Sequence, residues 1–510
     1  MGSRGSSPLG LWASAGRGWR GRAGAGAWAG AGAGGVGRGA GRAAGGGGGG
    51  GGRRGAAAGG PGPGGGGGGA AAAPAPLPAS LAGAPRVVLK GGKARLFREG
   101  NPLVYGGAVD RVEGPRPGAG DLVAVLDGAK NPLGWGAYNP QSIFRVRLLQ
   151  TPSEFAARPE LGLDLRGVLE ERTAAAVRLR RALGLPRRGA GATDAYRLIN
   201  SEGDHLSGLV VDALGPSLVV LSGAAWVERH REIVEGVLRE QAGGHFERIV
   251  WRRSKVALGK EGVRVVGSEE KEPAVEGPGG ASPPEEGGEG AEGEEVVVVH
   301  ERGLKFYASA LSGQKSGFYA DQRENRALVQ SLAEGREVLD VCCYSGGFSI
   351  SAAAGGATGV TGVDTSAPAL ELARSNAALN GFPQCNFEEE DASAFMRTAF
   401  QEGRRWDLIV LDPPKLAPSV KALPKALRKY KKLNRAALRL LRPGGLLLTC
   451  TCSGAVTKSG QFPEVVKQAA YEADREFRWL QTRGAAPDHP VNVAYQEGGA
   501  YLTAGLVSVL

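Results

Sequence analysis

Two side chains with the potential for chemistry, a carboxylate and a thiol, each stand directly behind an apolar run. Asp412 opens the sequence DPPK after the run Asp407–Leu411. Cys452 follows the apolar strand expected over Gly445–Thr451. Ligands of open α/β sheets bind outside the carboxyl ends of the strands, so we expect both side chains to face one crevice. Alternation along the strand puts Cys450 deeper, as a packed core thiol.

A thiolate and a carboxyl group beside a methyl donor are what methylation of carbon 5 of a cytosine requires. Carbon 5 is too electron-poor to attack a methylsulfonium directly, but a thiolate that adds to carbon 6 makes it nucleophilic. An acid at the ring nitrogen takes up the developing charge. Methylation of exocyclic amines or guanine ring nitrogens needs no thiol, so Cys452 is the discriminating residue. The alternatives are structural, because Asp-Pro is common in turns and free cysteines are often buried and inert.

The expected methyl-donor site is the stretch from Glu337 to Asp364. An apolar strand, a glycine turn at Gly346-Gly347, a helix and a second strand form half of a nucleotide-binding α/β unit. Asp364 lies 24 residues after Asp340 and can accept hydrogen bonds from two ribose hydroxyls. The pattern is not GxGxxG, so a cofactor with a ribose but no phosphate, S-adenosylmethionine, fits better than NAD. A Rossmann-like unit without this specificity is the alternative.

The remaining elements predict an α/β protein with three folded parts. Residues 86–160 show short strands between turns, typical of a small β-barrel, and residues 161–300 form an α+β middle domain. In residues 301–510, alternating strands and helices predict a parallel sheet of Rossmann-like form. Within these parts we expect one helix over Ala225–Gln241, a basic helix over Pro424–Leu441, and a solvated acidic loop at 267–295. Basic side chains at the start of the barrel are either a solvated face or an RNA-contacting surface, and they are Lys90, Lys93, Arg95 and Arg98.

The charge of the chain is concentrated in its first 85 residues. The 510 residues carry a net charge of +11, and eight arginines in residues 1–85 leave about +3 for the rest. Net charge alone therefore does not imply a nucleic-acid partner. An arginine-rich, acid-free start predicts an organelle transit peptide, with chloroplast favoured over mitochondrion. The alternative is a low-complexity disordered tail, and the protein would then be cytoplasmic.

Cysteine usage and hydropathy exclude several classes of protein. The five cysteines are an odd number confined to the C-terminal half, which indicates a reducing compartment rather than a disulfide framework. Without a histidine cluster or C-x-x-C spacing, no metal site is expected. No run reaches 18 apolar residues, so we expect no membrane partner.

From Arg86 to Leu510 the chain resembles the RlmI-type methyltransferases, which make 5-methylcytosine in large-subunit ribosomal RNA from S-adenosylmethionine. That family has a PUA domain, an α+β middle domain and a Rossmann-like class I methyltransferase domain, in the order expected above. Six ordered motifs carry the resemblance, at Ser312–Arg323, Cys343–Phe348, Val363–Ser366, Asp412–Lys415, Thr451–Gly454 and Asp488–Pro490.

The resemblance implies Cys452 as the nucleophile and Asp412 as the residue that holds the cytosine. It implies that Ser345 and Gly346 contact the methionine part of the cofactor, Asp364 its ribose and Asp391 its adenine. Tyr344 and Asp412 are also expected at the cofactor, and ribosomal RNA is the expected partner. Basic residues around the predicted helix would grip RNA phosphates, above all Lys415, Lys429, Lys431 and Lys432.

Three alternatives stay open. A methyltransferase of the same fold could act on another RNA or base position. A non-catalytic RNA-binding assembly factor could have kept the fold, although the intact pair Asp412 and Cys452 argues against it. A homodimer is also compatible with the sequence.

Overall fold

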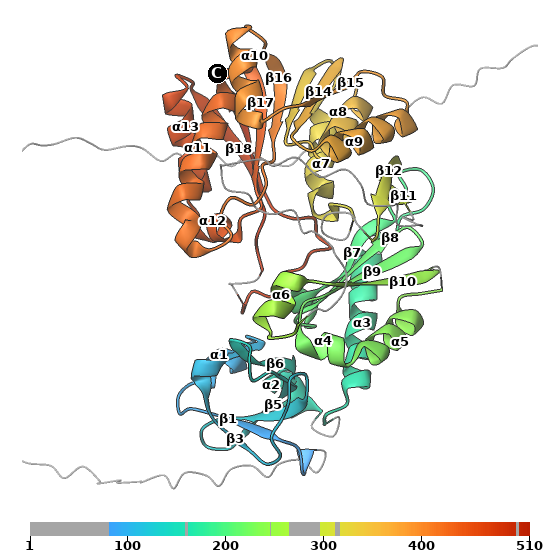
Figure 1. Ribbon diagram of the computed structural model, residues 1–510, viewed down its shortest axis with the longest axis vertical. Coiled ribbons are helices and arrows are strands. Elements are labelled where there is room, and N and C mark those ends of the chain that lie inside the picture. Colours follow the sequence, from blue (N-terminus) through green and yellow to red (C-terminus); the bar gives the residue numbers. More distant parts are fainter. Residues whose placement is uncertain (1–80, 159–161, 245, 265–295, 312–316, 496–498) are drawn as a thin grey trace, which may run out of the picture. The chain divides into compact units, whose positions relative to one another are not determined.

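The computed structural model describes residues 81–158, 162–244, 246–264, 296–311, 317–495 and 499–510 (Figure 1). Our expectations for the tail before residue 81, for the acidic loop 267–295 and for the motif residues 312–316 lie outside the described residues. Within them the chain forms sheets of six, four, two and seven strands, and the α/β class that we predicted is confirmed.

The first part of the chain is a six-stranded sheet in the order β2-β6-β5-β4-β1-β3. Its pairs are antiparallel except for β1 with β4. Val87, Phe97, Val125 and Val146 belong to the apolar core of this sheet. The elements are β1 (Arg86–Leu89), α1 (Arg95–Arg98), β2 (Leu103–Tyr105), η2 (Gly106–Ala108), β3 (Val109–Glu113), β4 (Leu122–Leu126), β5 (Pro132–Tyr138), β6 (Phe144–Gln150) and α2 (Pro152–Ala157).

The middle part is a four-stranded sheet in the order β10-β9-β8-β7, with β9 and β10 parallel. Helices α3 and α5 pack on it through a core that includes Leu169, Val211 and Val234. The elements are α3 (Leu165–Ala182), β7 (Ala195–Asn200), η4 (Ser201–Asp204), β8 (Leu209–Leu214), β9 (Ser217–Ser222), α4 (Ala225–Arg229), α5 (Arg231–Gln241), β10 (Arg248–Arg253) and α6 (Lys255–Lys260). A hairpin of β11 (Val296–Glu301) and β12 (Leu304–Ser309) follows.

The helix that we expected over Ala225–Gln241 is two helices. His230 interrupts it with φ −108° and ψ 29°, outside the helical region. Its Nε2 lies 3.0 Å from the carbonyl oxygen of Gly120, which ties the break to the first sheet. A tertiary contact thus overrides the local helical pattern.

The last part is a seven-stranded sheet in the order β15-β14-β13-β16-β17-β19-β18. The first five strands are parallel, as the alternating pattern predicts, whereas β19 runs antiparallel to both neighbours. The order reverses at β13, which has the second strand on one side and the fourth on the other. The strands are β13 (Glu337–Val341), β14 (Gly359–Asp364), β15 (Cys385–Glu389), β16 (Trp406–Leu411), β17 (Leu441–Thr451), β18 (Phe477–Arg483) and β19 (Thr503–Val509).

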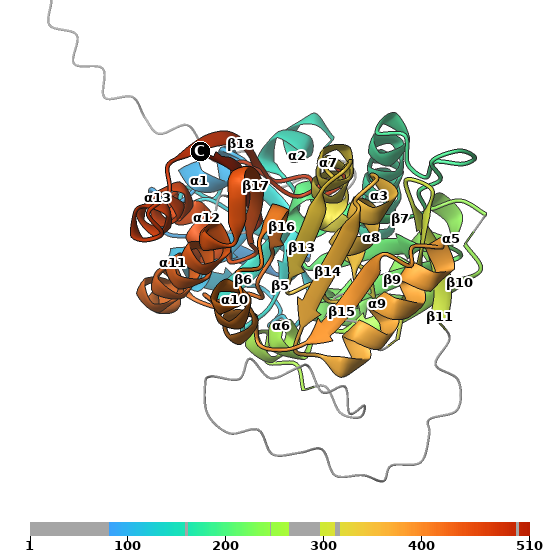
Figure 2. The same cartoon turned by 90° about the horizontal axis from the view of Figure 1, so that it is seen from above.

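Helices cover both faces of this sheet (Figure 2). Along β16, Leu408 and Val410 face the core with α7 and α8, whereas Ile409 and Leu411 face the core with α10, α11 and α13. This alternation is what a buried strand requires. The helices are η5 (Ala320–Gln322), α7 (Arg323–Leu332), α8 (Gly347–Ala354), α9 (Ala367–Asn380), α10 (Ala392–Gln401), η6 (Val420–Ala422), α11 (Leu423–Arg439), α12 (Gly454–Ser459) and α13 (Phe462–Glu472). Of the helices in the described residues, none is long and apolar enough to cross a membrane.

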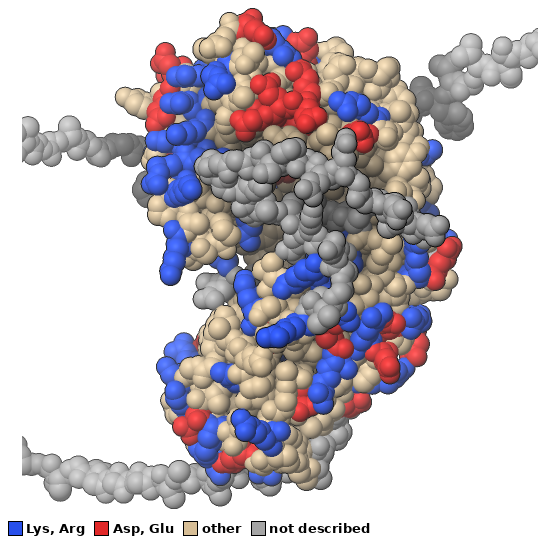
Figure 3. Space-filling model, in the orientation of Figure 1, with Lys and Arg blue, Asp and Glu red and all other residues tan. Residues whose placement is uncertain are grey.

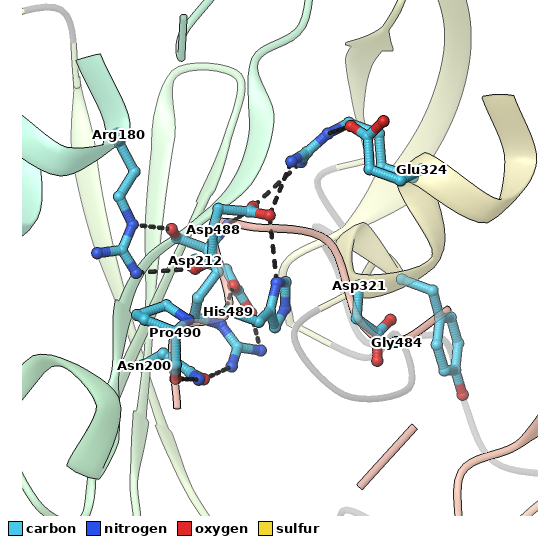
Figure 4. Close-up of polar contacts among 12 residues, drawn as sticks. Arg180, Asn200, Asp212, Asp321, Glu324, Gly484, Asp488, His489 and Pro490 are labelled. Atoms are coloured by element: carbon cyan, nitrogen blue, oxygen red, sulfur yellow. Dashed lines mark hydrogen bonds and ion pairs between the residues drawn. The ribbon is translucent and has the colours of Figure 1, made fainter. Parts of the chain in front are cut away.

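A buried network of ions ties the segment between β18 and β19 to the middle sheet (Figure 4). Asp488, with no exposed surface, accepts two hydrogen bonds from the guanidinium of Arg323 (2.7 and 3.1 Å) and one from the backbone N–H of Arg197 (2.9 Å). Arg180 of α3 donates to the carbonyl of Asp488 (2.8 Å) and to both carboxylate oxygens of Asp204. Burial alone would raise the pKa of Asp488, but the bonds from His489 and Arg323 lower it well below its usual range.

Replacement of Asp488 should therefore destabilise the protein strongly. We expect Asp488→Ala to lower the free energy of unfolding by about 3–5 kcal/mol, because among the described residues the buried Arg323 guanidinium keeps only the longer, 3.4 Å pair with Glu324. Urea unfolding followed by circular dichroism measures the loss. The exposed pair Glu464–Lys467 is the control, since Glu464→Ala should leave the midpoint unchanged. If both variants unfold at the same urea concentration, the network does not make the proposed contribution to the free energy of unfolding.

Candidate functional site

The predicted site residues follow the carboxyl ends of five neighbouring strands of the large sheet. The turn of Tyr344, Ser345 and Gly346 follows β13, Asp364 ends β14, Asp391 follows β15, Asp412 follows β16 and Cys452 follows β17. The crevice outside these ends, at the reversal of strand order, is where sheets of this type bind ligands. The structure thus brings the predicted cofactor and catalytic residues to one edge.

The turn after β13 has a left-handed backbone at three positions. Cys342, Tyr344 and Gly346 have φ values of 64°, 50° and 79°. The backbone N–H groups of Cys342 and Cys343 both donate to the carbonyl of Val363 (2.8 and 3.0 Å), which fastens the turn to β14. At Gly346 a Cβ would lie 3.1 Å from that of Ala373 and 3.2 Å from the Phe387 ring. Close packing and positive φ together require glycine here.

The two acids predicted at the cofactor differ in their surroundings. Asp364 is half-buried and oriented by the backbone N–H groups of Tyr344 (2.9 Å) and Ser366 (3.0 Å). Asp391 is exposed and caps α10, accepting from the N–H groups of Ser393 and Ala394 (2.9 and 3.0 Å). Capping gives Asp391 a structural task independent of any ligand.

The two predicted catalytic residues lie on adjoining segments. Cys452 is half-buried, and its Sγ lies 3.9 Å from the carbonyl oxygen of Pro413, the residue after Asp412. Asp412 is also half-buried; its backbone N–H donates to Val341 (3.2 Å), and its Oδ2 accepts from Nε2 of Gln322 (2.8 Å). Cys450 is fully buried, and burial raises the pKa of its thiol well above the usual value.

Tyr430 of the basic helix α11 holds the segment around Cys452 in place. Its hydroxyl accepts from Oγ1 of Thr451 (2.8 Å) and lies 3.2 Å from Oγ of Ser453. Oγ of Ser453 in turn accepts from the backbone N–H of Ala417 (3.0 Å) in the loop after Asp412. The residues on both sides of Cys452 are thereby fixed, although this tyrosine was not predicted. Its signal in the sequence is only the buried spacing Ala426, Tyr430, Leu433 and Ala437.

Several carboxylates converge on the turn after β13. Burial raises the pKa of the Cys342 thiol, and the charges of Asp364, Asp412, Asp340 and Asp391 add to the effect. A thiol that resists ionisation in this way is a poor nucleophile, so Cys342 has a packing role. The three acids at the strand ends, Asp364, Asp391 and Asp412, make this edge of the sheet suited to hydroxyl and amine donors.

The predicted RNA-binding lysines are not equivalent. Lys415, Lys429 and Lys432 are exposed, whereas Nζ of Lys431 lies 2.7 Å from Glu472 of α13. Lys and Arg side chains gather on the side of the molecule where α11 lies (Figure 3). No group of three His, Cys, Asp or Glu side chains that could hold a metal ion is found among the described residues.

The donor set fits S-adenosylmethionine. A half-buried carboxylate ends the second strand, where a ribose needs acceptors, and a tight glycine turn lets the backbone approach a ligand. A model of S-adenosylmethionine-dependent methyltransferases matches residues 284–490, and one of PUA-like domains matches residues 87–151. The fold and the site define an S-adenosylmethionine-dependent methyltransferase with an N-terminal PUA-like domain. Both expectations, the fold class and the cofactor, are confirmed.

Relatives of the chain narrow the class. Proteins named "Ribosomal RNA large subunit methyltransferase I" from Photobacterium profundum and Escherichia coli O127:H6 are 34% and 33% identical to it. Each alignment covers 81% of this chain and 96% of the relative. The crystal structure of "SMU.776, a putative methyltransferase complexed with SAH" has the same fold, at a TM-score of 0.65 and 20% identity over 83% of this chain and all of that one. The chain belongs to the ribosomal RNA large subunit methyltransferase I family, as its motifs indicate.

The relatives also correct one prediction. They are bacterial proteins, so the organellar location that we expected, with chloroplast favoured over mitochondrion, is wrong. The error has a physical source. An arginine-rich, acid-free composition is shared by transit peptides and by low-complexity tails, so composition alone could not separate them.

Asp340, beneath the glycine turn, should make stability depend on pH. Its Oδ2 accepts from N and Oγ of Ser349 (3.0 and 2.7 Å), while among the described residues its buried Oδ1 has no hydrogen-bond partner. Burial, with the charges of Asp412 and Asp364, raises the pKa of Asp340 to about 7. Between pH 4 and 7 the native protein keeps a proton that the unfolded chain loses, so stability falls as pH rises.

We expect the contribution of Asp340 to the free energy of unfolding to fall by about 2–3 kcal/mol between pH 5 and pH 8. This fall should be absent in Asp340→Asn. Urea unfolding at both pH values measures it. The control is the exposed Asp474, whose replacement by Asn should leave the difference between the two pH values unchanged. The same pH dependence in wild type and Asp340→Asn would refute this assignment.

Proposed function

We propose that the protein methylates carbon 5 of a cytosine in large-subunit ribosomal RNA through a covalent adduct to Cys452. The observation that carries the proposal is the contact between the Cys452 thiol and the Pro413 carbonyl, which sets a nucleophile beside Asp412 at the edge of the cofactor site. The family provides the class of RNA, since its named members are ribosomal RNA large subunit methyltransferases.

Tyr344, Ser345, Gly346, Asp364 and Asp391 would hold the cofactor in this scheme, with Asp412 between cofactor and base. When bound, S-adenosylmethionine supplies a methyl group on a positively charged sulfur. Asp364 is already oriented for binding the cofactor, because two backbone N–H groups hold its carboxylate in a fixed orientation. The exposed Asp391 would contact the adenine of the cofactor at the outer end of the site.

Cys452 loses its proton to water and its sulfur adds to carbon 6 of the base, so that the π electrons of the C5–C6 bond move to carbon 5. Asp412 holds the pyrimidine against the DPPK loop while the ring carries this extra electron density. Once carbon 5 bears the methyl group, its proton leaves to water, the C5–C6 double bond forms again and the Cys452 thiolate is expelled. The thiolate is therefore regenerated in each turnover.

The PUA-like domain and the exposed face of α11 support RNA as the substrate. Lys425, Lys429 and Lys432 lie on neighbouring turns of this helix and are exposed. The ammonium of Lys431 is held by Glu472, so we expect it to contribute less to phosphate binding than the other three.

Removal of the thiol tests the chemistry. We expect Cys452→Ala to lose methyl transfer to bacterial large-subunit ribosomal RNA by at least about 1,000-fold while binding S-adenosylmethionine normally. Digestion of the RNA and mass spectrometry of its nucleosides identify the product, and calorimetry measures cofactor binding. Cys385→Ala, at the opposite end of its strand, is the matched control. A methylguanosine or methyladenosine product, or normal turnover without Cys452, would point to another base.

The salt dependence of RNA binding tests the basic surface. We expect the double variant Lys429→Gln, Lys432→Gln to weaken binding and to lower the slope of log K against log salt by about 1–2, because two phosphate contacts are lost. Filter binding across a range of salt concentrations measures the slope. Lys431→Gln on the same helix is the matched control, with a smaller expected change. Unchanged slopes in both variants would indicate that α11 is only a solvated face.

A further inference from the structure

The motif residue Gln322 joins the catalytic site from a segment that the proposed mechanism does not use. It is buried, with 3% of its surface exposed, in the short helix η5 ahead of α7. Its Nε2 donates to Oδ2 of Asp412 at 2.8 Å. The same side chain is within hydrogen-bonding reach of the Cys450 thiol on β17. It therefore contacts both strands whose ends carry the predicted catalytic residues.

The polarity of this amide is fixed by a chain of hydrogen bonds. Nε of Arg483, which can only donate, lies 3.1 Å from Oδ1 of Asn325. Nδ2 of Asn325 is then left to donate to Oε1 of Gln322, at 2.6 Å. With its oxygen occupied, Gln322 can present only N–H to Asp412. Amide orientation follows from the network, and here an arginine at its far end determines it.

The neighbours of Gln322 leave it little freedom to move. Oδ2 of Asp321 accepts from the hydroxyl of Tyr501 (2.7 Å), and its carbonyl accepts from the backbone N–H of Ala486 (2.8 Å). Arg323 forms the buried pair with Asp488 described above. Three consecutive buried residues thus bind separate partners, and the middle one binds Asp412.

We propose that Gln322 is a positioning residue for the methyl-transfer reaction. It holds one carboxylate oxygen of Asp412 with a donor of fixed polarity, so that the carboxylate cannot turn away when the base enters. The inference rests on the proposed function, because it concerns the group that holds the base. Gln322 acts through Asp412, so its loss lowers kcat. A misplacement of this kind costs about 100-fold in rate.

Gln322→Glu tests the donor because the two side chains have almost the same shape. At high pH the new carboxylate faces Asp412 without a proton to donate, and we expect kcat to fall about 100-fold relative to wild type. At mildly acidic pH the introduced carboxyl group, once protonated, can donate again, so the ratio of variant to wild-type kcat should rise at least about fivefold. Total transfer of labelled methyl groups from S-adenosylmethionine to bacterial large-subunit ribosomal RNA measures the ratio, whichever base is modified.

Two further variants keep the test decisive. Asn325→Asp removes the donor to Gln322 without touching Asp412, and we expect about a tenfold loss of kcat. Gln330→Glu makes the same chemical change later in α7, where the side chain is half-buried, and should leave kcat and its pH profile unchanged.

The outcomes separate the two proposals. A ratio for Gln322→Glu that stays near one, or that is low and independent of pH together with a lowered melting temperature, overturns the positioning role. If the wild-type protein forms a product other than 5-methylcytidine, the proposed function is wrong. The pH-dependent ratio of kcat values can still be measured on that other methyl transfer. A rising ratio supports Gln322 as the residue that positions Asp412.

Discussion

The parallel pairing of β13 with β14 on one side and β16 on the other is the constraint on which the site depends. Parallel strands end at one edge, so the loops that follow them must share the same small space. Here those loops carry Asp364, Asp412 and the turn at Gly346, and Cys452 follows on the next strand. The register of the sheet brings these side chains together.

The convergence brings several carboxylates close together, and hydrogen bonds from the scaffold offset the repulsion between them to different degrees. Four acids lie close enough to affect one thiol, Cys342. Asp364 and Asp391 are stabilised by backbone N–H groups, and Asp412 by the amide of Gln322. Among the described residues, Asp340 accepts hydrogen bonds only from Ser349, and in its fully buried position its charged form is disfavoured. Hydrogen-bond donors of the scaffold thus hold three of these acids in place, whereas burial disfavours the charge of the fourth.

The sequence predicted the elements that are buried and local. The strands that lead to Asp364, Asp412 and Cys452 are apolar runs and were expected, although β17 begins at Leu441, four residues before the predicted Gly445. The strands β2 and β3 were not predicted, because β2 has three residues and β3 exposes Asp110, Arg111 and Val112. The antiparallel direction of β19 was not predicted either, since direction depends on the connection and not on composition. Gln322 stood within a recognised motif, but its contact with Asp412 spans 90 residues and has no local signal.

The insertion of β19 between β17 and β18 divides the sheet into an early and a late half. Strands β13 to β16 can pair with one another without any residue beyond Leu411. The strand that ends at Cys452 gains its second neighbour only from Thr503–Val509, far later in the chain. A chain that ended before Thr503 would thus have the strand framework for a methyl donor, while Cys452 followed a strand with only one neighbour.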